Sequence, residues 1–221
     1  EAYSYFDNMD SLVANIYSVL PVDFGRVSDA MMESATDNSV YTWENNSIYY
    51  LTNGTWSPLK RVDDGWAFWT GIRSANSFLE NYDPEVLKRF EYNEDYADMM
   101  AKVSKFSYEV RFLRAFYLFE LAKRYGNIPL VTRTYTQEEI NSIEKTPFVE
   151  VIDYIAKECS EIALELPADQ SEVRNETGRV TKGAALALKS RALLYAASAL
   201  HNPDNDPTRW EAAAKAAYEV I

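Results

Sequence analysis

The segment Phe112 to Leu130 reads FLRAFYLFELAKRYGNIPL and joins a long helical pattern to an abrupt ending. Apolar side chains occur on nearly every face of the helical part, rather than along one stripe. A helix that packs on one side needs only a single apolar stripe, so this helix is expected to be buried on several sides. Gly126 favours a left-handed cap after the helix, and Pro129 prevents the helix from resuming.

Helical periodicity continues on both sides of this segment. Apolar residues at intervals of three and four predict helices near residues 4–20, 64–81, 95–125, 147–166, 181–200 and 206–221. A shorter helix is predicted to begin at Asp83-Pro84, with aspartate as the cap and proline at the first position. Thr146-Pro147 and Asp206-Pro207 repeat this arrangement, and Thr181 is the predicted cap of another helix. No strand-rich region is found, so the sequence predicts an all-α chain.

The predicted helices follow one another in pairs with short turns. Several carry alanine and aromatic residues spaced as in tetratricopeptide helices, most clearly in WEAAAKAAYEVI, residues 210–221. Paired helices that stack into a superhelix bury each helix on two sides. We therefore predict a tetratricopeptide-like superhelix, in which the opening segment packs between neighbouring helices.

A long polar segment, residues 22–62, separates the first two long helices. In SIYYLTNGTW, Asn53-Gly54 lies between aromatic runs and predicts a short hairpin. The segment is rich in aromatic residues, which argues against disorder, and loops of this length usually carry function. Just beyond it, Trp69 shares the apolar stripe of the next helix with Ile72 and is assigned to the core.

The composition limits the classes of partner. The chain of 221 residues has a formal net charge of −12, and no cluster of lysine or arginine interrupts its acidic character. Such a chain repels phosphate backbones and anionic lipid, so neither nucleic acid nor a membrane surface is an expected partner. Cys159 lies on an apolar stripe and is predicted to be buried, whereas His201 is predicted to contact a helix dipole.

Catalytic and metal-binding motifs find no support. The sequence has no glycine-rich phosphate loop, no zinc-ligand spacing and no nucleophile elbow. No pair among the 34 acidic residues is distinguished by its spacing. Asp204 and Asp206 resemble part of a calcium loop, but the glycine at its sixth position is missing, and a turn with a helix cap is the better interpretation. We therefore expect no catalytic residue, no cofactor and no metal.

The aromatic stretch is the strongest candidate for ligand binding. Four of the five tryptophans fall between residues 43 and 69, among asparagines, aspartates and Arg61. Flat rings beside such groups suit sugars, because a ring covers the apolar C–H face of a pyranose while polar groups bind its hydroxyls. The same rings could instead pack the segment against the helices, since large aromatic residues are mostly buried.

The segment EVRFLRAFYLFELAKRYGNIPL, residues 109–130, closely resembles the signature of the SusD/RagB family of Bacteroidetes. That signature is E-x-R-x-L-R-A-x-Y-x-x-x-L followed by Y-G-x-x-P-L. Three further segments resemble other elements of the family and occur in the same order: SATDNS (34–39), WTGIRSANSFLEN (69–81) and GRVTKGAALALKSRALLYAAS (178–198). In the second segment, Trp69 stands in place of the usual tyrosine. The resemblance extends over nearly the whole chain.

The resemblance implies a lipoprotein on the surface of the outer membrane. Such a protein would capture glycan and pass it to a SusC-type TonB-dependent transporter without breaking bonds. A peptide ligand, as in the RagB branch, and a helical-repeat scaffold without a small ligand are the alternatives. Residues 1–221 look like the N-terminal helical portion, with the loop 22–62 inserted between helices, whereas the C-terminal portion and the lipidated cysteine are absent from this sequence.

The resemblance also implies that aromatic residues from loops of this region contribute to a glycan site. In this sequence the candidate carbohydrate-binding residues are Trp43, Asn53, Trp56, Arg61 and Trp66. In a peptide-binding relative the same residues would be ordinary packing residues. Within the signature helix, Arg111 and Arg114 share a face and are predicted to pair with acids on adjacent helices.

Overall fold

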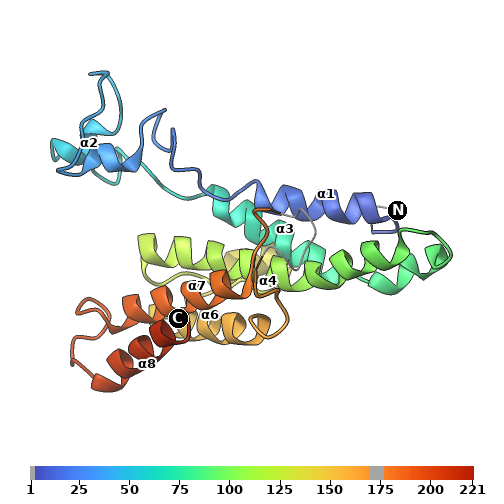
Figure 1. Ribbon diagram of the computed structural model, residues 1–221. Helices are drawn as coiled ribbons and strands as arrows, with labels where there is room; N and C mark the ends of the chain where they lie inside the picture. Colours follow the sequence, from blue (N-terminus) through green and yellow to red (C-terminus); the bar gives the residue numbers. More distant parts are fainter. Residues whose placement is uncertain (1–2, 170–176) are drawn as a thin grey trace. The chain divides into compact units, whose positions relative to one another are not determined.

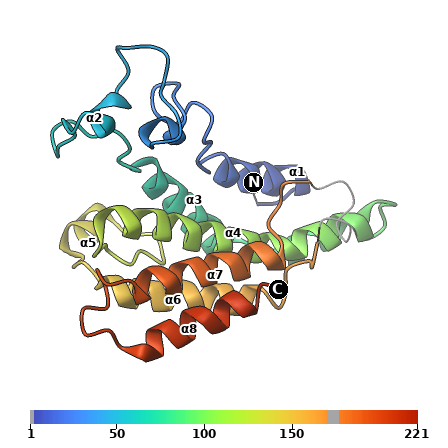
Figure 2. The ribbon, with the colours of Figure 1, turned by 60° about the vertical axis from the view of Figure 1, so that its left-hand side comes forward.

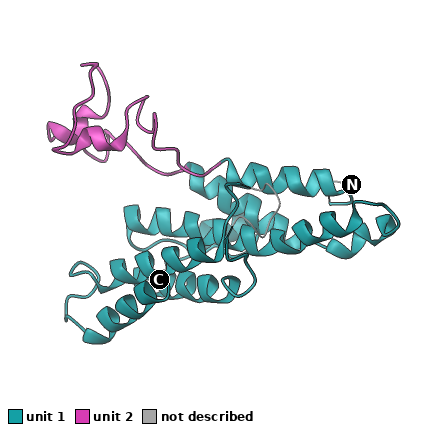
Figure 3. Cartoon of the chain, in the orientation of Figure 1, with its two compact units in different colours: residues 1–18, 67–221 teal, residues 19–66 magenta. Residues whose placement is uncertain are grey.

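A computed structural model describes residues 3–169 and 177–221, and the chain divides into two compact units (Figure 3). Unit 1 comprises residues 1–18 and 67–221, and unit 2 comprises residues 19–66. In the described residues the regular structure is helical, and β-pairing is limited to isolated bridges. The predicted all-α class is therefore confirmed. No helix within the described ranges is long and apolar enough to cross a membrane.

Unit 1 is built from the long helices of the chain. Its elements are α1 (Phe6–Tyr17), α3 (Ala67–Asn81), the 3-10 helix η2 (Pro84–Phe90), α4 (Tyr96–Tyr125), α5 (Gln137–Ser142), α6 (Phe148–Ile162), α7 (Lys182–Ala197) and α8 (Pro207–Tyr218). Helices that follow one another in the chain pack together, as α3 does with α4, α6 with α7, and α7 with α8. Figures 1 and 2 show α6, α7 and α8 close together, and α7 packs against both of the others.

Most predicted helix starts are correct, because side chains fix them locally. Asp83 accepts a hydrogen bond from the backbone N–H of Glu85, and Asp206 accepts one from Thr208. Thr181 likewise caps α7 through the N–H of Ala184. The ends are shorter than predicted: α1 stops at Tyr17, α6 at Ile162 and α7 at Ala197. Helix α5, which was not predicted from the sequence, begins with a capping box between Thr136 and Glu139.

Helix α4 is the central element of unit 1. It packs against α1, α3, η2, α6 and α7. Its buried side chains lie on several faces: Val103, Phe106, Glu109, Val110, Phe112, Leu113, Arg114, Ala115, Tyr117, Leu118, Phe119, Glu120, Leu121 and Ala122. The near-continuous apolar pattern of the signature segment is therefore explained by neighbours on several sides.

The turn after α4 also starts α6. The N–H of Gly126, whose φ is 69°, donates to Ala122 at 2.8 Å, but its ψ of −109° lies outside the predicted left-handed helical region. Asn127 then accepts a hydrogen bond from the N–H of Phe148 at 2.9 Å. The prediction of Thr146 as the cap of α6 is wrong, because its N–H pairs with Ile128 and the cap position falls on Pro147.

An ion-pair cluster joins α4 to α6. Arg111 contacts Glu158 at 2.7 Å and Glu161 at 2.5 Å, and Arg114 contacts Glu158 at 3.1 Å. The two arginines of the signature segment therefore pair with acids of an adjacent helix, as predicted. Burial raises the pKa of Glu158, but hydrogen bonds and charges from both guanidinium groups outweigh it and hold the pKa below its usual value.

The same cluster reaches α3 and the segment after α4. Arg114 donates to the side chain of Asn76 at 2.9 Å and to the carbonyl of Thr132 at 3.0 Å. The amide of Asn76 donates in turn to the carbonyls of Val131 and Arg133. One buried network thus fixes α3, α4, α6 and the segment that leaves α4.

A second network holds α1 against α4 and the start of α7. Tyr17 donates to Glu109 at 2.7 Å, and Arg179 contacts the same carboxylate at 3.0 Å. Arg179 also pairs with Asp10, which accepts from Lys102 at 3.1 Å. These contacts position the GRVTK element, which bears the N-terminal cap of α7.

Unit 2 has a small core of its own. Val27, Ala30 and Ile48 are buried, and Met32, Ala35, Tyr41, Tyr49, Leu51 and Val62 pack against them. Its regular elements are η1 (Met32–Ala35) and α2 (Tyr49–Thr52). The predicted hairpin is wrong: the aromatic run before Asn53 forms the helical turn α2, which packs on this core, and Gly54 leaves it with a φ of 72°.

The surroundings of three further side chains can be compared with their predicted surroundings. Cys159 is buried, as predicted, and burial raises the pKa of its thiol to about 12. Trp69 is only half-buried, whereas its neighbour Phe68 occupies the core beside Tyr117. The ring of His201 stacks on Phe148 with centroids 3.6 Å apart, a contact that was not predicted from the sequence.

The Glu158→Gln substitution is expected to lower the free energy of unfolding by about 2–3 kcal/mol, because it leaves two guanidinium groups without their shared carboxylate. The matched control is Glu161→Gln, one turn along α6, where the side chain is 49% exposed and contacts Arg111. That change is expected to cost less than about 1 kcal/mol. Urea unfolding of both variants measures the difference, and equal costs would contradict a central role for Glu158.

Acid is expected to remove the same stabilisation. The folded-state pKa of Glu158 is lowered, so its contribution is present above the unfolded pKa of about 4.3 and is lost as pH falls through the folded value. The stability gap between the unmodified chain and Glu158→Gln should therefore shrink between about pH 6 and about pH 3. Urea titrations across this range measure the gap, and a gap independent of pH would refute the assignment.

Candidate functional site

The five candidate binding residues all lie in unit 2 and are exposed. The side chains of Trp43, Trp56 and Trp66 are 70%, 61% and 53% exposed. Other aromatic residues, Tyr41 and Tyr49, pack against the core of unit 2. The alternative interpretation, in which the tryptophans pack the segment, therefore does not describe these three rings.

Trp43 stands beside a ring that is anchored to the core. Its ring meets that of Tyr41 edge to face, with centroids 6.2 Å apart. Tyr41 packs on the core of unit 2, and its carbonyl accepts a hydrogen bond from the hydroxyl of Tyr49. The position of Trp43 is therefore supported from one side, while most of its surface stays open to solvent.

Asn53 and Trp56 belong to the turn that follows α2. The side-chain oxygen of Asn53 accepts from the N–H of Thr55 at 3.0 Å and from its hydroxyl at 2.6 Å. The N–H of Trp56 donates to the carbonyl of Tyr50 at 2.8 Å, which closes the turn. Asn53 thus shapes the loop that presents Trp56, and its amide nitrogen remains a donor for a ligand.

Arg61 and Trp66 are linked through one carboxylate. Asp64 lies 4.0 Å from the guanidinium of Arg61 and accepts from the N–H of Trp66 at 3.1 Å. Beside it, Asp63 pairs with Arg26 at 2.9 Å, and this half-buried pair ties the two ends of unit 2 together. Asp64 was not among the candidate residues predicted from the sequence, and it orients the backbone of Trp66 beside Arg61.

The candidate residues thus form three local groups: Tyr41–Trp43, Asn53–Trp56 and Arg61–Trp66. Each group presents an exposed ring, and in the second and third groups the ring lies next to polar side chains, which is the combination that sugars require. Lys60, which the sequence analysis did not select, lies 5.2 Å from the ring of Tyr50 and adds a cation beside the second group. Among the described residues, no group of three or more histidine, cysteine or acidic side chains could hold a metal ion.

Comparison with known proteins gives the class to which this architecture belongs. A family model described as SusD-like, starch-binding associating with outer membrane, matches residues 4–194. The fold is therefore the tetratricopeptide-like all-helical fold of SusD-like proteins, as predicted. Because the match covers most of the sequence, the chain belongs to the SusD-like family.

Solved structures agree with this assignment. A SusD-like protein from Bacteroides fragilis superposes with a TM-score of 0.73 at 29% identity, over 99% of this chain and 38% of its own. A SusD-like carbohydrate-binding protein from the same species gives a TM-score of 0.72 at 22% identity, over 99% and 40% of the two chains. A laminarin-binding SusD-like protein gives 0.68 at 22% identity, over 97% and 43%. No curated protein matches the chain at a significant level.

The length of these structures sets the extent of the comparison. The present chain spans about two fifths of each of them. The two structures that are 22% identical to this chain identify its fold, but they do not identify its ligand. What the complete relatives bind and assemble with therefore enters only as a proposal for this chain.

The exposure of Trp56 can be measured directly in solution. We expect Trp56→Phe to remove part of the tryptophan emission that acrylamide quenches readily, because this side chain is 61% exposed. The matched control Trp69→Phe removes a half-buried ring and should leave the readily quenched fraction in place. Stern–Volmer plots measure both fractions, and a reversed order would show that the two rings have been placed wrongly.

Proposed function

We propose that this chain is the helical portion of a glycan-binding protein on the surface of the outer membrane. It captures an oligosaccharide or polysaccharide and passes it to a SusC-type TonB-dependent transporter. The proposal is supported by the family match over residues 4–194, whose description names starch binding and the outer membrane. The observation that carries it for this chain is the exposure of three tryptophans on one small ordered unit.

The mechanism is capture without chemistry. The rings of Trp43, Trp56 and Trp66 stack on the apolar C–H faces of sugar units, which removes apolar surface from water on both partners. Asn53 and Arg61 donate to hydroxyls and orient the chain of sugars. Affinity is modest because sugar hydroxyls exchange hydrogen bonds with water for hydrogen bonds with protein. Such weak, reversible contacts suit a protein that must release its ligand to a transporter.

The proposal assigns no bond-breaking step to this chain. The two carboxylates next to Trp66 are engaged with cations or a backbone donor: Asp63 pairs with Arg26, and Asp64 contacts Arg61 and the N–H of Trp66. A glycosidase needs a carboxyl group held protonated in a pocket next to a second carboxylate. The geometry of unit 2 supports recognition of a glycan surface.

Calorimetry or affinity electrophoresis with neutral oligosaccharides, including starch and laminarin fragments, tests the function. Trp56→Ala and Trp66→Ala should each weaken the binding of the active glycan by about five- to tenfold, because each removes a stacking surface. Trp210→Ala is the matched control, since Trp210 is a 43% exposed tryptophan of unit 1, and it should leave affinity unchanged.

Two outcomes would reject the proposed function, and a third would reject the proposed site. If no glycan binds but peptides do, the protein belongs to the peptide-binding branch of the family. If neither binds while the chain still associates with a SusC-type transporter, a scaffold without a small ligand is the correct function. If a glycan binds and all three alanine variants behave alike, binding occurs away from the three groups of unit 2.

A further inference from the structure

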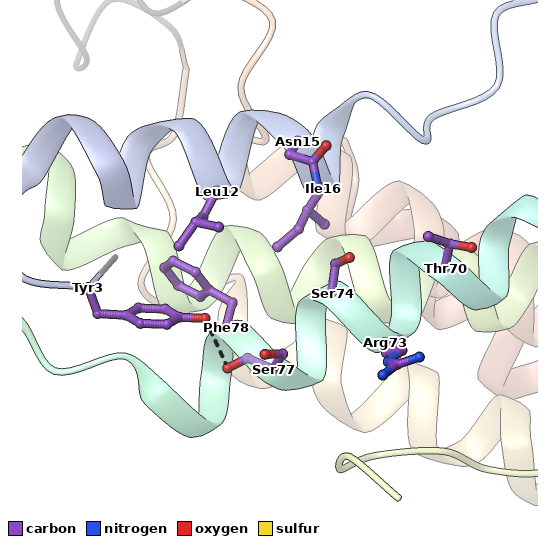
Figure 4. Close-up of a pocket in the computed structure, with 9 residues that line it drawn as sticks. All are labelled: Tyr3, Leu12, Asn15, Ile16, Thr70, Arg73, Ser74, Ser77 and Phe78. Atoms are coloured by element: carbon purple, nitrogen blue, oxygen red, sulfur yellow. Dashed lines mark hydrogen bonds between the residues drawn. The ribbon is translucent and has the colours of Figure 1, made fainter. Parts of the chain in front are cut away.

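A pocket lies between α1 and α3, entirely within unit 1, as Figure 4 shows. Its volume is about 230 Å³. Ligand pockets for drug-sized molecules hold about 300–1,000 Å³, so this one suits a single small ring rather than a chain of sugars. Its lining residues are Tyr3, Leu12, Asn15, Ile16, Thr70, Arg73, Ser74, Ser77 and Phe78.

The lining divides into an apolar floor and a polar rim. Leu12 and Ile16 of α1 and Phe78 of α3 supply the apolar lining, and the hydroxyl of Tyr3 donates to the carbonyl of Ser77 at 3.3 Å (Figure 4). The rim comes mainly from one stripe of α3, where Thr70, Arg73, Ser74 and Ser77 follow the helical spacing of three and four. Asn15 of α1 completes it.

Arg73 distinguishes this rim from the rest of the molecule. Within residues 3–169 and 177–221, every other arginine makes a hydrogen bond, an ion pair or a ring contact. Arg73 makes none with the described chain and is exposed at the edge of the pocket. The side chains of Asn15, Thr70, Ser74 and Ser77 likewise have no hydrogen-bond partner in the described residues.

The charge of the lining selects the ligand. None of the 9 residues that line the pocket is acidic, although the chain as a whole carries a net charge of −12. One guanidinium with no partner binds one carboxylate, with which its fork of donors forms paired hydrogen bonds. The neighbouring hydroxyls and amide match a hydroxylated ligand, and the apolar floor matches the C–H face of a ring.

We propose that this pocket binds a sugar acid, a single pyranose unit that carries a carboxylate, as in a uronic acid. The carboxylate pairs with Arg73, ring hydroxyls bind Ser74, Thr70 and Asn15, and the C–H face lies on Leu12, Ile16 and Phe78. The site is separate from the tryptophan groups, since all its residues belong to unit 1. This pocket would recognise an acidic sugar, in addition to the glycan proposed to bind the three tryptophan groups of unit 2.

NMR titration of the whole 221-residue chain with glucuronate, glucose and acetate tests this assignment. Glucuronate should shift resonances of α1 and α3 with millimolar affinity, and glucose and acetate should each bind at least about tenfold more weakly. Arg73→Gln should reduce glucuronate binding to the level of glucose. The control Lys157→Gln removes another exposed positive charge, from α6, and should leave binding unchanged.

Each possible result decides the question. Glucose binding as tightly as glucuronate would show that Arg73 recognises nothing, and acetate binding as tightly would show that the ring and its hydroxyls contribute nothing. Unaltered binding by Arg73→Gln, with a folded spectrum, overturns the proposal as well. Trp56→Ala is expected to retain glucuronate binding, because that residue belongs to unit 2. If this variant loses glucuronate binding, the sugar acid binds at the tryptophan groups of unit 2 and not in this pocket.

Discussion

The carboxylate of Glu158, buried between two guanidinium groups, is the interaction on which unit 1 depends. A charge removed from water is costly unless it is paired and hydrogen-bonded, so the arrangement is stable only when its partners are all in place. Arg111 and Arg114 lie on α4, Glu158 lies on α6, and Asn76 of α3 completes the contacts of Arg114. Three helices must therefore reach one register together. Apolar packing allows small sliding movements between helices, whereas this network specifies a single arrangement.

The architecture was predictable because its determinants are local. Helical periodicity predicted each long helix, and the capping residues Asp83, Thr181 and Asp206 predicted the starts of η2, α7 and α8. The error at Asn53-Gly54 has a physical reason. A glycine with positive φ serves a hairpin turn and also the exit from a helical turn, and only packing of Ile48 and Tyr49 on a non-local core decides between them. The prediction of the cap of α6 failed for a similar reason. The side chain that accepts from the N–H of Phe148, the first residue of α6, is Asn127, which lies 21 residues earlier in the chain.

The candidate site could be predicted in composition but not in arrangement. The sequence shows that residues 41–69 are rich in aromatic rings, and it leaves open whether these rings pack against the fold or face a ligand. Which ones are exposed follows from packing: Tyr41 and Tyr49 join the core, and Trp43 is left outside. The link from Arg61 through Asp64 to Trp66 depends on a turn at Gly65, whose φ is 67°, and no spacing rule reports it.

The use of arginine connects structure with recognition. In this acidic chain most guanidinium groups hold the fold together, as Arg114 and Arg179 do at the contacts of α4. The terminal nitrogens of these two groups are engaged in hydrogen bonds and ion pairs that the fold supplies. Arg73 is exposed and has no hydrogen bond or ion pair with the described residues, and it stands next to hydroxyls that likewise have no partner there. A binding pocket needs polar groups that the fold has left unsatisfied above an apolar floor, and the space between α1 and α3 meets this requirement.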